Sequence, residues 1–312
     1  MGDIEIARGL LRKEIKMDDS LLIAKGVLAF TYIVTGDYDM AMEINLENLK
    51  KAEEIGDKDI QGRSLHSIGV VYRDKGDYEK ALDYYERALA IREEIGYKHG
   101  VGKSLHNIGI VYYLRGDLDT ALDYYERSLA IKEEYGDKRG MGCCLTDIGV
   151  VYWIKGDYEK ALEYYNRELK INEELDDLFQ NSISNSLTNM GLVYFQQEVY
   201  NKAIEYLDKS ATMQMELDSI ITLETVSHLF LSKKILGKEY NVAGIHTLIK
   251  KQEEIYFYIN FALFKLLDDP SYLETAYNQV QEKASAMDDK SSNKFLSYPI
   301  PKAILEEWER VK

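Results

Sequence analysis

Gly100–Ser104 reads "GVGKS", which resembles the end of the loop that holds phosphate in nucleotide-binding proteins. The full motif needs a further glycine five residues before Gly102, and that position is Tyr97. The motif must also follow a β-strand, whereas the residues before Gly100 have the spacing of a helix. The stretches 40 residues earlier and later are "IQGRS" and "GMGCC". We therefore interpret Gly100–Ser104 as a turn between repeats and expect no phosphate site there.

His66 and His106 are the next candidates for chemistry, because they occupy equivalent positions 40 residues apart. If they lie on neighbouring helices about 10 Å apart, their rings can approach each other. A metal site needs more ligands than two, and no Cys, Asp or Glu recurs in the matching column. We therefore expect a pair of ligand-contacting or exposed histidines and no metal site.

The cysteines and the remaining polar residues do not indicate catalysis. Cys143 and Cys144 are the only cysteines, and because they are adjacent they supply neither a disulfide framework nor a four-ligand zinc site. The sequence has no Ser/His/Asp set, no HExxH motif and no activated cysteine in a catalytic setting. We expect no enzyme, no catalytic residues and no cofactor.

One phrase occurs three times at a spacing of 40 residues. It reads "GDYEKALDYY" from Gly76, "GDLDTALDYY" from Gly116 and "GDYEKALEYY" from Gly156. Other columns recur at the same spacing, with small residues at Ala29, Gly69, Gly109 and Gly149 and tyrosines at Tyr32, Tyr72, Tyr112 and Tyr152. A fifth copy continues at Gly191, Tyr194 and Ala203, displaced by two residues. We place the extra pair in a loop within residues 175–186, where a longer connection costs little.

Each copy has the pattern of two helices. Leu105, Ile108, Gly109 and Tyr112 follow the i, i+3, i+4, i+7 spacing of a buried helix face. The next Gly-Asp pair is suited to end this helix and to cap the following one. Antiparallel helix pairs with small residues at their contacts stack into a superhelix, because one pair cannot bury its apolar face alone.

These columns together resemble the tetratricopeptide-repeat family. The 40-residue period and the "GDK" turns at residues 56–58 and 136–138 are similar to its longer-helix branch, which includes the kinesin light chains and Pins-type polarity scaffolds. The resemblance covers residues 20–218 and implies an all-α, right-handed superhelical solenoid of five repeats. We expect a degenerate sixth repeat over 219–260 and capping helices over 261–312, with two helices near Pro270, a polar loop at "DDKSSNK" (288–294) and a last helix from 301.

Residues 1–19 match the second helix of a repeat whose first helix is absent. Two explanations stay open for this orphan helix. It is either a remnant of a preceding repeat in a longer chain or a natural N-terminal cap.

In tetratricopeptide proteins the first helix of each repeat lines a concave groove. The resemblance implies that the groove for a peptide is lined here by Arg63, His66, Arg73, Lys103, His106, Tyr113, Leu114, Trp153, Ile154 and Phe195. The matching columns of the first copy include Ile23 and Phe30. One column lacks the Asn with which chaperone-binding members hold a C-terminal carboxylate, so we do not expect a cochaperone of that kind.

The charge and the apolar content of the chain exclude some classes of binding partner. The net charge of −15 without a basic stripe argues against nucleic acid. No apolar run is long enough for a membrane span and no signal peptide is present, so we expect a cytoplasmic protein that does not bind membranes. On this acidic chain, the cations of the second and third copies predict a protein or peptide ligand with acidic residues at one end. Tyr113, Trp153 and Phe195 would supply its apolar anchoring.

Three functions follow from this sequence. The first is a non-catalytic scaffold that binds a peptide segment in its groove. The second is the sensory or regulatory arm of a larger signalling enzyme, and the third is self-association through the solenoid ends, which light scattering over a concentration range would detect. An alternative placement also stays open, in which the C-terminal helices fold back over the groove. If Trp153 lines an open groove, Trp153→Ala leaves the melting temperature nearly unchanged, and a large drop means that it is covered.

Overall fold

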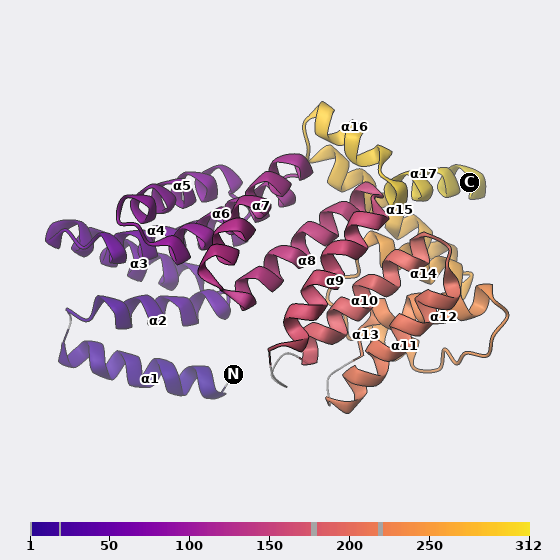
Figure 1. Cartoon of the computed structure of the whole chain (residues 1–312), viewed down its shortest axis with the longest axis horizontal. Helices are drawn as coiled ribbons and strands as arrows, with labels where there is room; N and C mark the ends of the chain where they lie inside the picture. Colours follow the sequence, from indigo (N-terminus) through magenta and orange to yellow (C-terminus); the bar gives the residue numbers. More distant parts are fainter. Residues whose placement is uncertain (1, 19, 176–179, 218–220) are drawn as a thin grey trace. The chain divides into compact units, whose positions relative to one another are not determined.

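In the computed structural model, which describes residues 2–18, 20–175, 180–217 and 221–312, the chain forms helices and turns, with no β-strand among these residues. It divides into two compact units, residues 1–136 and 137–312. Unit 1 contains α1 (Gly2–Met17), α2 (Leu22–Val34), α3 (Tyr38–Ile55), α4 (Lys58–Asp74), α5 (Tyr78–Glu94), α6 (Lys98–Leu114) and α7 (Leu118–Tyr135) (Figure 1). No helix of the described ranges is long and apolar enough to cross a bilayer.

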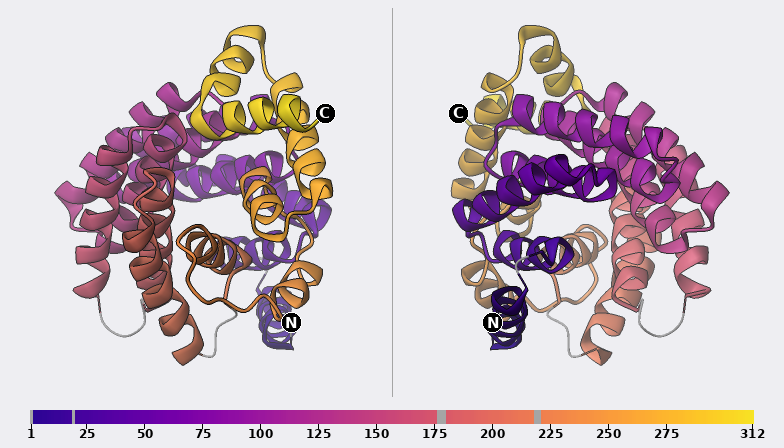
Figure 2. Two further views of the ribbon diagram at one scale, coloured as in Figure 1. Left: turned by 90° about the vertical axis from the view of Figure 1, so that its right-hand side faces the viewer. Right: turned by 90° about the vertical axis from the view of Figure 1, so that its left-hand side faces the viewer.

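Unit 2 continues the same pattern and then departs from it. Its helices are α8 (Lys138–Lys155), α9 (Tyr158–Glu173), α10 (Gln180–Gln196), α11 (Tyr200–Glu216), α12 (Leu223–Ile235), α13 (Ile245–Lys250), α14 (Phe257–Leu267), α15 (Pro270–Ser285), α16 (Asp289–Ser297) and α17 (Pro299–Val311). Within each unit consecutive helices pack on one another, except that α14 packs on α12 and not on α13 (Figure 2). The predicted all-α solenoid of helix pairs is therefore confirmed.

The turn inside each of the first four pairs is the one that Gly-Asp predicts, whereas Glu198 and Val199 form the turn of the fifth. Gly76 adopts φ 80°, in the left-handed region that favours glycine. Asp77 then caps α5, because its carboxylate accepts a hydrogen bond of 3.2 Å from the backbone N–H of Lys80. Within a pair, a lysine that opens the first helix forms an ion pair with a glutamate at the end of the second helix, as in Lys138–Glu174 at 2.8 Å.

Tyrosine and glycine set the distance between the two helices of a pair. Tyr85 is fully buried, and its neighbour Tyr84 stacks on Tyr72 with ring centroids 5.4 Å apart. A Cβ on Gly69 would lie 2.7 Å from the ring of Tyr85, so a larger residue there would force the helices apart. The paired tyrosines are therefore a core residue and an edge residue.

Three local predictions need correction. Gly100–Ser104 lies in the first turns of α6 and not in a turn between repeats, because α6 already begins at Lys98. The "DDKSSNK" segment is not a loop: Asp288 accepts from the N–H of Ser291 and so caps α16. The second helix expected in the sixth repeat is reduced to the six residues of α13. The loop that holds the two-residue insertion was expected within residues 175–186; residues 176–179 lie outside the described part of the chain, and from Gln180 the segment is already α10.

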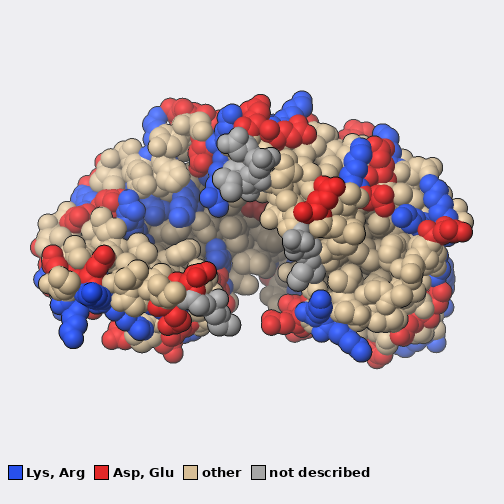
Figure 3. Space-filling model, turned by 90° about the horizontal axis from the view of Figure 1, so that it is seen from below, with Lys and Arg blue, Asp and Glu red and all other residues tan. Residues whose placement is uncertain are grey.

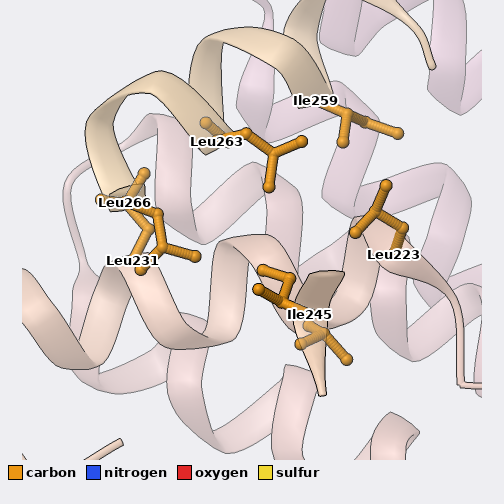
Figure 4. Packing of buried hydrophobic residues seen from close by; sticks show 8 residues of the cluster. Leu223, Leu231, Ile245, Ile259, Leu263 and Leu266 are labelled. Carbon is orange, nitrogen blue, oxygen red and sulfur yellow. The ribbon is translucent and has the colours of Figure 1, made fainter. Parts of the chain in front are cut away.

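The C-terminal helices have a core of their own. Leu223 and Leu231 of α12, Ile245 of α13, and Ile259, Leu263 and Leu266 of α14 form one buried cluster (Figure 4). Phe195 of α10 packs against the same cluster. The end of unit 2 is therefore joined to its repeats through a shared apolar core.

Gly109→Leu tests the helix spacing. A Cβ at Gly109 would lie 2.7 Å from the ring of Tyr125, so we expect the variant to lose about 1–3 kcal/mol of unfolding free energy. Gly9→Leu is the control, since no atom lies within 4 Å of its Cβ position. Equal denaturation midpoints for Gly109→Leu and the wild type would contradict this packing.

Candidate functional site

A cavity of about 420 Å³ opens in unit 1 between the first helices of successive repeats. Its walls come mainly from α2, α4 and α6, and its floor includes Asn45 and Asn48 of α3 and Arg92 of α5. Such a volume is within the range of sites that hold small ligands or parts of a peptide. It is therefore the candidate binding site of this unit.

The α2 wall is apolar and open. Ile23, Val27 and Phe30 line the cavity and have 65%, 49% and 59% of their surface exposed. Their spacing of four and three residues places them on one helix face. Exposed large apolar side chains grouped around a cavity are typical of binding surfaces.

The floor carries a buried cation. Arg92 is 5% exposed, and its Nη1 donates to Ser104 Oγ at 2.6 Å and to the carbonyl of Gly100 at 3.2 Å. Burial lowers the pKa of Arg92 to about 10, which leaves the guanidinium protonated at neutral pH.

His66 supports this arginine. Arg92 Nη1 lies 3.3 Å from His66 Nδ1, and because a guanidinium can only donate, Nδ1 is the acceptor. Burial, and then the charge of Arg92, lowers the pKa of His66 well below its usual value. The histidine is therefore neutral at physiological pH, with its proton on Nε2. Its ring also lies against Tyr85, at 5.3 Å between centroids.

The other predicted cations of unit 1 differ in their pairing. Arg63 lines the cavity and pairs with Asp59 at 2.8 Å. Arg73 donates to Asn107 Oδ1 at 3.0 Å and pairs with Asp74, so its charge is already balanced. Lys103 lines the cavity, and no carboxylate in the described part of the chain pairs with it. The space-filling view shows Lys and Arg side chains beside areas of uncharged surface on unit 1 (Figure 3).

His106, Tyr113 and Leu114 lie on α6, outside the lining of the cavity. The ring of His106 packs against Tyr125 at 5.5 Å, which repeats the arrangement of His66 and Tyr85 one copy earlier. Tyr113 is half-buried and Leu114 is 40% exposed. Among the described residues no three His, Cys, Asp or Glu side chains gather as a metal site.

In unit 2 the predicted groove residues contact the C-terminal helices. Trp153 of α8 is only 9% exposed, and its ring meets Tyr258 of α14 edge-on at 5.4 Å. Phe195 of α10 meets His228 of α12 in the same way at 5.1 Å. Ile154 is half-buried. Trp153 is therefore not an open groove side chain in this structure, and the alternative in which the C-terminal helices cover it describes its position.

A polar bond holds this covering in place. Tyr258 donates its hydroxyl hydrogen to Glu224 Oε1 of α12 at 2.6 Å. His228 is fully buried next to these rings, and burial lowers its pKa to about 4. The neutral imidazole accordingly packs as part of the core.

Sequence reasoning missed the residues that distinguish the cavity. Arg92 follows Ala81, Tyr85 and Ala88 on the buried face of α5, so its place in an apolar column is the signal that could have found it. Asn48 Oδ1 is buried without a hydrogen-bond partner among the described residues, while its Nδ2 donates to the carbonyl of Leu22 at 2.8 Å. Both residues lie on second helices, whereas the family resemblance implies a groove lined by first helices.

Trp153→Ala tests the covering of α8. Removing a buried indole leaves a cavity, so we expect a loss of about 3 kcal/mol or more of unfolding free energy in chemical denaturation. Met215→Ala, at a side chain of α11 that is 64% exposed, is the control and should change little. A Trp153→Ala midpoint equal to the wild type would show that the indole is open to solvent.

Glu168→Gln tests the buried carboxyl of α9. Burial raises the pKa of Glu168 from 4.5 to about 7, so the native state holds a proton that the unfolded chain releases above pH 4.5. This stabilisation is present below pH 4.5 and is lost as pH rises through 7. We expect Glu168→Gln to match the wild type near pH 4.5 and to exceed it by about 2–3 kcal/mol at pH 8.

The comparison between variants cancels the contributions of other titrating groups, including His228. Glu163→Gln, at an exposed carboxylate of the same helix, is the control for the Glu-to-Gln substitution itself. A difference between Glu168→Gln and the wild type that does not vary with pH would contradict the raised pKa.

Solved structures with the same fold cover nearly the whole chain. The apo form of RapI is 17% identical with a TM-score of 0.69, over 99% of this chain and 94% of its own. A signal-transduction ATPase with a tetratricopeptide-repeat sensor from Pyrococcus horikoshii is 20% identical with a TM-score of 0.65, over 98% of this chain and 44% of its own. NprR in complex with its cognate peptide NprX is 19% identical with a TM-score of 0.55, over 99% of this chain and 84% of its own.

Family models agree with these structures. A comparison with curated protein sequences gave no match. Two models described as tetratricopeptide repeat match residues 20–94 and 100–174, and 184–214, which together exceed half of the 312 residues. The chain belongs to the tetratricopeptide-repeat proteins.

Proposed function

We propose that this chain is a non-catalytic binding protein that holds an extended peptide segment in the cavity of unit 1. The observation that carries the proposal is the open apolar face of α2, where Ile23, Val27 and Phe30 line a cavity of about 420 Å³. Apolar side chains of the segment would pack against this face. The buried Asn48 Oδ1 would accept a hydrogen bond from one of its N–H groups.

Charge favours an acidic segment. Arg92 and Lys103, which pair with no carboxylate of the described residues, line the cavity of a chain whose net charge is −15, so an acidic ligand would be attracted to the cavity and repelled by the rest of the surface. The fold is shared with NprR, which was solved with a peptide. A cytoplasmic setting, where such a segment could belong to a soluble partner, is part of the proposal.

Selection from a random-peptide display library against the full chain tests this function. We expect enriched peptides with apolar and acidic residues that bind at about micromolar strength, roughly −8 kcal/mol. Phe30→Glu should weaken the binding of these peptides by about tenfold or more, because it places a charge against their apolar side chains. Ile6→Glu is the matched control, since Ile6 is 65% exposed on α1 but does not line the cavity.

Two results would contradict the proposal. The first is a library that yields no peptide binding above background. The second is a set of peptides that Phe30→Glu and Ile6→Glu weaken equally.

A second candidate function is the sensor arm of a larger signalling protein. It is favoured by the fold shared with the Pyrococcus horikoshii ATPase. This chain matches only 44% of the length of that larger protein. Detection of the intact polypeptide in its source cell by immunoblot decides between the two. A band well above 36.0 kDa would support a sensor arm, and a band at that mass would contradict it.

A further inference from the structure

Arg92 uses only part of its hydrogen-bonding capacity. Its bonds to Ser104, Gly100 and His66 all come from Nη1. In the described part of the chain, Nε and Nη2 of Arg92 have no hydrogen-bond acceptor. The edge formed by these two nitrogens is the one that matches the two oxygens of a carboxylate.

The charge of Arg92 is also unbalanced. No carboxylate of the described residues forms an ion pair with it, although only 5% of the surface of Arg92 is exposed. Lys103 is a second unpaired cation on the same cavity, and the carboxylate of Asp59 is held by Arg63 at 2.8 Å. Burial, then the charges of Arg92, Arg63 and Lys132, lowers the pKa of Lys103. A buried cation among other cations is costly unless an anion joins them.

The position of the fork is fixed by its neighbours. Ser104 Oγ, the Gly100 carbonyl and the neutral His66 all accept from Nη1, which holds the guanidinium plane of a residue that lines the cavity. A site whose donors are already oriented loses little entropy when a ligand binds. None of these three acceptors brings a negative charge that would compete with a ligand.

We propose that the floor of the cavity is a carboxylate-binding site, in which Arg92 Nε and Nη2 donate to the two oxygens and the Lys103 ammonium adds a second positive charge. The inference rests on the proposed function, because the carboxylate would belong to the segment that packs on α2. It differs from the clamp of chaperone-binding members, which uses first-helix residues, because the fork here comes from the second helix α5.

The neighbouring repeats lack this fork. The positions equivalent to Arg92, 40 and 80 residues later, are Lys132 and Asn172. A lysine presents a point charge and an asparagine none, so neither can give the bidentate geometry. The site is specific to the repeat that borders the apolar face of α2.

Arginine side-chain NMR provides a direct test with glutarate as the probe. The Arg92 Nε–H signal is identified by its loss in Arg92→Lys, and we expect it to shift saturably as glutarate is added to the full chain. Lys103→Gln should weaken the binding of glutarate by about three- to tenfold. Arg87→Lys is the control, since Arg87 pairs with Asp83 on an exposed part of the same helix. An Arg92 Nε–H signal that does not move would overturn the site.

Peptides from the display selection separate the possible sources of the carboxylate. Each peptide is compared as free acid, as C-terminal amide, with Asp and Glu replaced by Asn and Gln, and with phosphoserine at the acidic position. We expect one amide replacement to weaken the binding of the peptide to the wild type by about tenfold or more. The same replacement should change binding to Arg92→Gln little, because that variant lacks the guanidinium. The C-terminal amide and the side-chain amides identify which carboxylate binds, and tighter binding of the phosphoserine form would overturn the preference for carboxylate.

The two proposals fail in different ways. Peptides that depend on Phe30 but are indifferent to every amide replacement would overturn the carboxylate site and leave the peptide function intact. A glutarate shift at Arg92 without any enriched peptide would support the carboxylate site and contradict the peptide function.

Discussion

The contact between a first-helix glycine and a second-helix ring is the constraint on which the repeats depend. A Cβ would lie 2.7 Å from Tyr85 at Gly69, 2.7 Å from Tyr125 at Gly109 and 2.5 Å from Tyr165 at Gly149. Because the tyrosine ring fills the space that a side chain would need, the two helix axes approach closely over each ring. In the second, third and fourth repeats this contact sets how closely the first helix lies on the second, and residues of α2, α4 and α6 line one cavity in unit 1.

The same geometry has different consequences in the two units. In unit 1 the apolar face of α2 is exposed and borders the cavity. In unit 2 the corresponding faces of α8 and α10 contact the C-terminal helices. The ring of Trp153 packs against Tyr258, and the ring of Phe195 packs against His228. The exposed aliphatic and phenylalanine side chains that line the cavity are therefore those of α2.

Polar groups inside the repeats give individual copies their chemistry. The column that holds Arg92 continues as Lys132 and Asn172, and Glu168 replaces the Ala88 and Ser128 of earlier copies. Burial shifts the pKa of Arg92 and Glu168 in opposite directions, because it disfavours the charged form of each. A repeated backbone can thus carry an unbalanced cation in one copy and a protonated carboxyl in another without a change of fold.

The sequence by itself determined the repeat, its helix pairs, the Gly-Asp turns and the family, because these depend on contacts within about 40 residues that recur in the same columns. Three features came only from the tertiary structure: the burial of Trp153 under Tyr258, the cavity beside α2, and the fork of Arg92 beneath it. Each depends on which distant segment packs on a given face, and the periodicity of a single helix carries no information about that partner.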